Sequence, residues 1–168
     1  MSYARRHALG RVYAIFPRRY ICGPLISDRE EFYRLDERTF ADWVQRGFFA
    51  LYWSDGCCQY GVGQEIDTWM DAGLNVVIAG DEMVLPKARQ RYPDVQTVLV
   101  TPREESLEQW VRDDPLFDEG GREGMLSHMQ TMQARYGDAA VIRTNLSIPD
   151  AGRQLVAVLR RAEPRQVA

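Results

Sequence analysis

The sequence predicts an α/β fold in which a mostly parallel sheet lies between two layers of helices. Short apolar runs alternate along the chain with segments of helical periodicity, which is the pattern of parallel strands joined by helices. Residues 74–79 are almost entirely apolar, as expected of a strand that is buried on both faces. The chain has 168 residues, of which 45% are hydrophobic and 27% charged, so one domain (1–168) with a substantial core is expected.

The elements can be placed in chain order from periodicity and from the residues that begin and end them. Expected strands cover residues 12–16, 48–53, 59–62, 74–79, 95–100 and 139–143. Expected helices cover 36–47, 65–72, the segment before Tyr92, a segment that begins at Thr101-Pro102, and 123–136 and 147–161. Asp36 is a typical N-cap, and Gly73 occupies a typical helix-stop position. Residues 17–35 contain Pro, Gly and mixed charges, and therefore indicate a loop.

Composition excludes several classes of function. The net charge of −3 argues against binding of nucleic acid through general attraction, and the apolar runs are too short to cross a bilayer. Three cysteines, of which Cys57 and Cys58 are adjacent in an expected turn, indicate reduced thiols in a cytoplasmic protein. The two histidines lack the spacing of metal ligands, so no metal site is expected.

Residues 48–101 carry a series of short motifs in one register, and weaker ones flank them. In chain order they are Ala50-Leu51-x-Trp53, Tyr60-Gly61-Val62, Glu65-Ile66-Asp67-x-Trp69, Val76-Val77-Ile78-x-Gly80, Val84-Leu85-Pro86-x-Ala88-Arg89 and Arg91-Tyr92-Pro93, with Arg18-Arg19-Tyr20-Ile21 before and Gly121-Arg122-Glu123 after. The series resembles the ribose 1,5-bisphosphate phosphokinases, a guanylate-kinase-like branch of the P-loop kinases. These enzymes transfer the γ-phosphate of ATP to ribose 1,5-bisphosphate and serve phosphonate breakdown.

The resemblance implies the positions of a ligand site. Residues 17–62 would form the acceptor-binding region, in which Glu30, Tyr60, Gly61 and Gly80 would contact the substrate. Gly61 would leave room for the ligand to approach. Residues 113–123 would form a lid that carries Arg122, and Asn145 would lie beside the adenine. Mg-ATP would be the cofactor if the kinase reaction is retained.

The sequence departs from the family pattern at the phosphate contacts. The family begins with a strand and a P-loop that ends in Gly-Lys, whereas Met1 falls where the second half of the following helix is expected. Lys87 is the sole lysine of the sequence and lies outside the expected site. Gly23 replaces the arginine that would clamp the acceptor phosphate, and Asp81-Glu82 replaces Ser-Arg. No catalytic residue can therefore be assigned, and whether the chain is an enzyme stays open.

Three functions follow as hypotheses. The first is a degenerate kinase relative that binds a phosphorylated sugar or nucleotide without transferring phosphate by itself, as an accessory or regulatory protein of phosphonate or phosphoribosyl pyrophosphate metabolism. The second is an active kinase whose P-loop comes from upstream sequence or from another chain. The third is a non-enzymatic interaction module. A fold without its first strand would expose a sheet edge, which favours a homodimer.

Overall fold

The computed structural model describes residues 13–24, 32–103, 124, 127–128, 130–132, 134–144 and 147–161. Its contacts divide the chain into two compact units, residues 1–95 with 159–168, and residues 96–158. Each unit is described by itself below. The expectation of a single domain stays a prediction.

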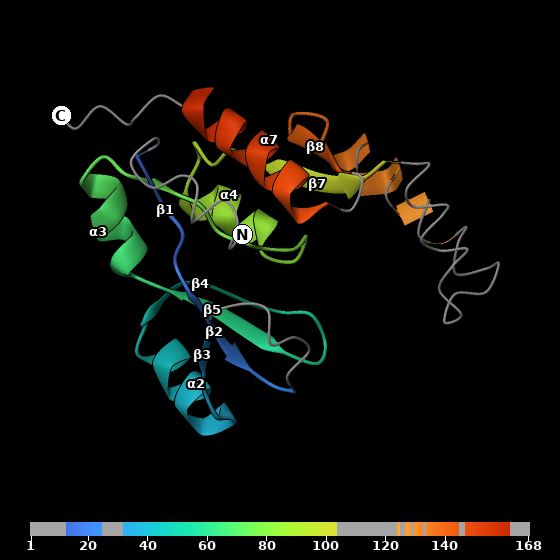
Figure 1. Ribbon diagram of the computed structural model, residues 1–168. Coiled ribbons are helices and arrows are strands. Elements are labelled where there is room, and N and C mark those ends of the chain that lie inside the picture. The colour runs from blue at the N-terminus through green and yellow to red at the C-terminus, as the bar shows by residue number, and fades with distance from the viewer. Residues whose placement is uncertain are drawn as a thin grey trace. The chain divides into compact units, whose positions relative to one another are not determined.

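The first unit contains two sheets (Figure 1). Strand β1 (Ala14–Ile15) pairs in parallel with β6 (Asn75–Val76). The second sheet has the order β3-β2-β5-β4, with bounds β2 (Arg19–Cys22), β3 (Phe32–Arg34), β4 (Phe49–Ser54) and β5 (Gln59–Gly63). Strand β2 pairs in parallel with β3 and antiparallel with β5, and β4 and β5 form an antiparallel hairpin.

Two helices of this unit begin and end as the sequence predicted. Helix α2 (Glu37–Gln45) is capped by Asp36, whose carboxylate accepts the Thr39 N–H at 2.8 Å. Helix α3 (Glu65–Asp71) is stopped by Gly73, two residues beyond its last turn. This residue has φ +80°, a backbone conformation that favours glycine. The Gly73 N–H bonds the Met70 carbonyl and the next amide bonds the Trp69 carbonyl, which is a Schellman motif.

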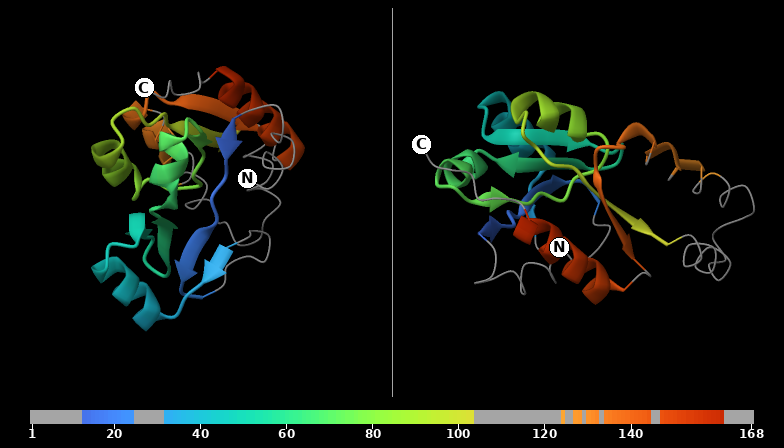
Figure 2. Two further views of the ribbon diagram at one scale, coloured as in Figure 1. Left: turned by 90° about the vertical axis from the view of Figure 1, so that its left-hand side faces the viewer. Right: turned by 90° about the horizontal axis from the view of Figure 1, so that it is seen from above.

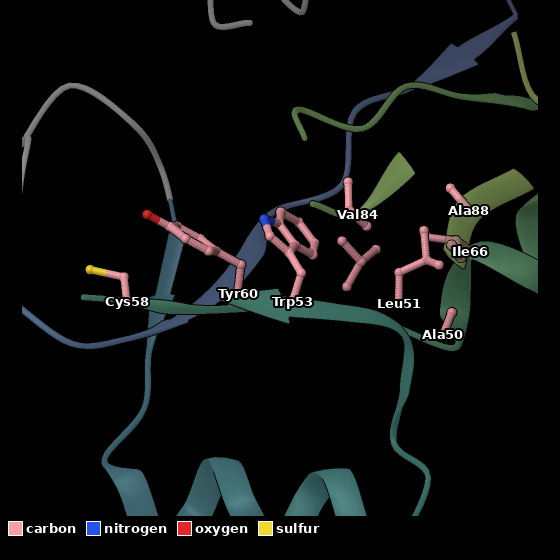
Figure 3. Packing of buried hydrophobic residues seen from close by; sticks show 9 residues of the cluster. Ala50, Leu51, Trp53, Cys58, Tyr60, Ile66, Val84 and Ala88 are labelled. Atoms are coloured by element: carbon pink, nitrogen blue, oxygen red, sulfur yellow. The ribbon is translucent and has the colours of Figure 1, made fainter. Parts of the chain in front are cut away.

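The two faces of the four-stranded sheet pack against different partners, because side chains alternate along each strand. One face contributes Tyr20 and Phe49, which pack with Phe40 and Trp43 of α2. The other face carries a larger cluster, which includes residues of α3 and of α4 (Leu85–Arg91). Its buried members are Ala50, Leu51, Trp53, Cys58, Tyr60, Val62, Ile66, Val84 and Ala88 (Figure 3).

In the second unit, β7 (Val98–Pro102) pairs in parallel with β8 (Ala140–Thr144) over five residue pairs. Figure 2 shows the two strands in yellow and orange. Helix α7 (Ile148–Arg161) follows Ser147, where the sequence predicted its start. Among the described residues, no helix is long and apolar enough to cross a bilayer.

Two sequence-based expectations of secondary structure need correction. Residues 17–35 hold strands β2 and β3 and not only loop, because β2 is paired with β5, whose residues lie about forty positions further on. Thr101-Pro102 forms the end of β7 and not the first turn of a helix, since the next amide, that of Arg103, bonds the Thr144 carbonyl of β8 at 2.8 Å. The rest of that expected helix lies outside the described residues. The predicted parallel pairing is present in β1–β6, β2–β3 and β7–β8, and the β2–β5 and β4–β5 pairs are antiparallel.

Candidate functional site

The candidate site begins with two stacked aromatic rings on the face of the sheet opposite α2. Trp53 of β4 and Tyr60 of β5 lie directly opposite each other in the hairpin. Their ring centroids are 5.3 Å apart, and both side chains are buried (Figure 3). The hairpin register therefore fixes an aromatic platform, formed by Trp53 and Tyr60, on the face of the sheet that points away from α2.

Arg19 of β2 brings a positive charge to this platform. Tyr20 faces α2, so the neighbouring Arg19 points to the opposite side of the strand. Its guanidinium lies 5.1 Å from the centre of the Tyr60 ring and donates a hydrogen bond to the Ala79 carbonyl at 3.3 Å. A guanidinium over an aromatic face is favourable. Arg19 thus joins β2, β5 and the segment that follows β6.

Asp55 holds the hydroxyl group of Tyr60. The Tyr60 O–H donates to one carboxylate oxygen of Asp55 at 2.7 Å, and the Cys58 N–H donates to the other oxygen at 3.0 Å. These bonds lower the pKa of Asp55, with the Tyr60 bond first. Burial, and then the bond to the Asp55 carboxylate, raise the pKa of Tyr60 well above its usual value. At neutral pH the pair is therefore a carboxylate and a neutral phenol.

Asp81 is part of the same polar arrangement. The indole N–H of Trp53 donates to Asp81 Oδ2 at 2.7 Å, and the Met83 N–H donates to Asp81 Oδ1 at 2.8 Å. Asp81 therefore fixes the turn that follows β6 and ties it to β4. The sequence comparison with the family marks Asp81 as a negative charge at a position expected to contact phosphate. In the structure the same carboxylate also holds two local hydrogen bonds.

The glycines of the region are packed closely. A Cβ on Gly61 would lie 2.5 Å from the Phe49 ring, on the face of the sheet toward α2. A Cβ on Gly80 would lie 2.6 Å from Val84 Cγ1. The ring of Phe49 fills the space beside Gly61 in which a ligand was expected. The ligand-contact roles of both glycines stay predictions.

The structure brings together part of the predicted site. Tyr60 is on the platform, and Gly80 lies between Ala79 and Asp81, which contact Arg19 and Trp53. Glu30, Arg122, Asn145 and the lid at 113–123 lie outside the described residues.

The sequence motifs contain both Arg19 and Trp53 but assign neither residue to the site. Because side chains alternate along a strand, Arg19 must point away from the face that carries Tyr20, and this alternation was the sequence signal for its place in the site. For Asp55 and its contact with Tyr60 there was no signal beyond the expected turn.

Two further features bear on the binding of a cofactor or a metal ion: the position of the sole lysine, and one group of potential metal ligands. Lys87 Nζ donates to the Tyr52 carbonyl at 3.1 Å and lies 4.3 Å from the centre of the Tyr52 ring. In the described part of the chain, Asp55, Cys57 and Cys58 are the group whose ligand atoms could share a metal ion, since these atoms lie within 4.8 Å of one another.

Comparisons with known proteins place the chain in a family. It is 31% identical to the ribose 1,5-bisphosphate phosphokinase PhnN of Thiobacillus denitrificans, over 97% of this chain and 86% of that protein. The protein of the same name from Psychromonas ingrahamii is 31% identical, over 95% of this chain and 82% of its own length. The one from Burkholderia pseudomallei is 43% identical over 99 residues, which are 58% of this chain and about half (52%) of that relative.

The fold has a solved counterpart. Guanylate kinase from Anaplasma phagocytophilum superposes with a TM-score of 0.68 over 94% of this chain and 78% of its own, at 17% identity. This match confirms the predicted guanylate-kinase-like α/β fold, whereas no family model matches the sequence. The extent and identity of the alignments to the Thiobacillus and Psychromonas proteins show that the chain belongs to the ribose 1,5-bisphosphate phosphokinase family.

Proposed function

We propose that this chain binds a phosphorylated sugar or nucleotide at the platform of Arg19, Trp53 and Tyr60 and does not transfer phosphate by itself. The observation that carries the proposal is the position of Arg19. Its guanidinium is held between the Tyr60 ring and the Ala79 carbonyl, so it is oriented in advance for an anion. A guanidinium offers donors in a planar fork that matches the geometry of a phosphate group.

The backbone at Gly23 supports the loss of an acceptor contact. The related kinases resemble this chain around residues 20–24 but carry an arginine at the position of Gly23. Here Gly23 has φ +136°, and a Cβ would lie 2.8 Å from the Cys57 carbonyl oxygen and 2.9 Å from Cys58 Sγ. A side chain at this position requires both an unfavourable backbone conformation and a shift of the hairpin turn.

The charges of the platform support weak rather than tight binding. Arg19 shares this region with the carboxylates of Asp55 and Asp81, and Glu82 follows directly. A ligand with two phosphates would meet carboxylates that repel it close to the guanidinium that attracts it. Lys87, the sole lysine of the sequence, donates a hydrogen bond to the Tyr52 carbonyl. In this position it does not add to the positive charge of Arg19.

Isothermal titration of ribose 1,5-bisphosphate, GMP and Mg-ATP, each alone at moderate salt, tests the binding. We expect a signal for the sugar bisphosphate or GMP, and an affinity roughly 10- to 100-fold lower in Arg19→Gln, the cost of one charge-assisted contact. Arg38→Gln, which removes an exposed arginine from α2, is the matched control. An unchanged affinity in Arg19→Gln contradicts the proposal. No binding of any of the three ligands favours the interaction module.

An active kinase is the second candidate, and the extent of the match to the Thiobacillus protein favours it. Its phosphate-binding loop would have to come from preceding sequence or from another chain. Incubation of the chain with labelled ATP and ribose 1,5-bisphosphate distinguishes the two. An activity that copurifies with the chain and forms product supports the active kinase. Ligand binding without product supports the degenerate relative.

A further inference from the structure

The turn between β4 and β5 collects three potential metal ligands within four residues. Asp55 and Cys58 close the turn through backbone and side chain: the Asp55 N–H donates to the Cys58 carbonyl at 3.2 Å, and the Cys58 N–H donates to Asp55 Oδ1 at 3.0 Å. Cys57 is exposed and Cys58 is buried, and neither is in a disulfide. The hairpin thus holds both thiols and the carboxylate together at the end of the sheet (Figure 3 shows Cys58).

Two of the three distances among the ligand atoms match tetrahedral coordination, and all three atoms lie within 4.8 Å of one another. The two Sγ atoms are 3.6 Å apart, and Cys57 Sγ lies 3.7 Å from Asp55 Oδ1. With zinc–sulfur bonds of about 2.3 Å, the sulfur pair subtends about 103° at the metal; with a zinc–oxygen bond of about 2.1 Å, the sulfur–oxygen pair subtends about 114°. Both angles are close to the tetrahedral value of about 109°.

We infer that the Asp55–Cys58 turn binds a thiophilic divalent cation of the zinc class through Cys57 Sγ, Cys58 Sγ and Asp55 Oδ1. The fourth position faces solvent on the exposed side of Cys57 and takes a water molecule. Two thiolates select soft and borderline ions over Mg²⁺ and Ca²⁺. Each thiol loses its proton when its sulfur binds the metal, so one ion displaces two protons, and the carboxylate binds as it stands.

Tyr60 supports this site from behind. Its hydroxyl donates to Asp55 Oδ2, the oxygen that the metal does not use, and so fixes the orientation of the carboxylate. Ligating carboxylates are commonly held by such a hydrogen bond. The Cys58 S–H now donates to the Pro24 carbonyl at 3.3 Å, and this bond is given up on metal binding. The site does not depend on the proposed ligand-binding function, since its three ligands are not part of the platform.

Titration of the folded chain with Co²⁺ under reducing conditions tests the inference. We expect one equivalent to produce both the near-ultraviolet absorption of thiolate-to-cobalt charge transfer and the strong visible bands of tetrahedral Co²⁺. Zn²⁺ added afterwards should remove both signals. Cys57→Ser should lower the affinity at least 10-fold and weaken the thiolate band. Because Cys57 is exposed, this variant should fold normally, which circular dichroism checks.

Cys22→Ala is the matched control, because Cys22 is the third thiol and packs on the opposite face of the sheet with Phe40 and Phe49. It should leave the cobalt spectrum unchanged. Tyr60→Phe should lower the affinity 10- to 100-fold without weakening the thiolate band, as expected for a residue that orients a ligand. Absence of a thiolate band in the wild-type chain, or retention of the full band in Cys57→Ser, overturns the inference.

Discussion

Replacement of Gly61 by alanine tests the packing beneath the platform. Gly61 lies in β5 between Tyr20 of β2 and Tyr52 of β4. An alanine Cβ at this position would lie 2.5–2.8 Å from three atoms of the Phe49 ring, whereas ordinary contacts begin near 3.4 Å. The ring is itself held by its neighbours, with the Phe40 centroid at 4.8 Å, and Phe49 is buried. It must therefore move by about an ångström within a packed aromatic cluster.

The magnitude follows from two opposing effects. Overpacking of a well-filled core costs about 1–3 kcal/mol. Alanine regains about 0.5–1 kcal/mol relative to glycine in a strand, because the unfolded chain is less free. From the centres of these ranges we expect Gly61→Ala to lower the free energy of unfolding by about 1.25 kcal/mol, which corresponds to a fall in Tm of roughly 2–5 °C for a chain of this size.

Urea unfolding of a double-mutant cycle with Phe49→Val provides the assay. Valine lacks the three ring atoms that the alanine Cβ meets, so Gly61→Ala should be nearly neutral or stabilising in that background. Gly124→Ala is the control, because no described residue lies within 4 Å of its expected Cβ and its position is helical. An equal loss of stability from Gly61→Ala in both backgrounds would refute the assignment of the cost to Phe49.

Three further predictions concern single hydrogen bonds. Removal of the α2 cap in Asp36→Ala should lower Tm by roughly 2–4 °C in thermal scans. Trp53→Phe leaves Asp81 without its indole donor and should cost about 1–3 kcal/mol in urea unfolding, and more than Asp81→Asn, which keeps an acceptor for the indole. Burial, and then the bond to Asp67, raise the pKa of Tyr92 from 10.0 to about 12. Tyr92 therefore ionises at a lower pH in the unfolded chain than in the folded chain. Its contribution to the free energy of unfolding is complete below pH 10 and falls by at most about 2 kcal/mol as the pH rises to 12. In Tyr92→Phe this part of the fall should disappear, and an identical alkaline loss in the variant would refute the assignment.

Local signals in the sequence predicted the helices well and the small strands poorly. Asp36 and Gly73 fix the ends of their helices through hydrogen bonds within a few residues, so the sequence alone contains the relevant partners. Strand β2 forms because it pairs with β5 about forty residues later, and its flanking Pro17 and Gly23 indicate a loop to any local reading. Non-local pairing of this kind leaves no periodic pattern in so short a segment.

The candidate site shows the same division. Tyr60 was predicted from its motif, and the structure places it on the platform. Its partners could not be predicted, because Arg19 reaches Tyr60 only through the register of β2 against β5. Likewise the contact of Trp53 with Asp81 spans 28 residues and depends on how the segment after β6 returns to the sheet.

The side chain of Tyr60 is common to the two proposed sites. Its hydroxyl is bound to the Asp55 carboxylate, while its ring carries the Arg19 guanidinium. Because one Zn²⁺ ion displaces two thiol protons, metal binding leaves the net charge of the turn unchanged, and with it the charge that opposes the guanidinium. An anionic ligand should therefore bind with the same affinity whether or not the turn holds zinc. Titration of ribose 1,5-bisphosphate with and without one equivalent of Zn²⁺ measures this, and tighter binding with Zn²⁺ in the wild type but not in Cys57→Ser would contradict the charge balance.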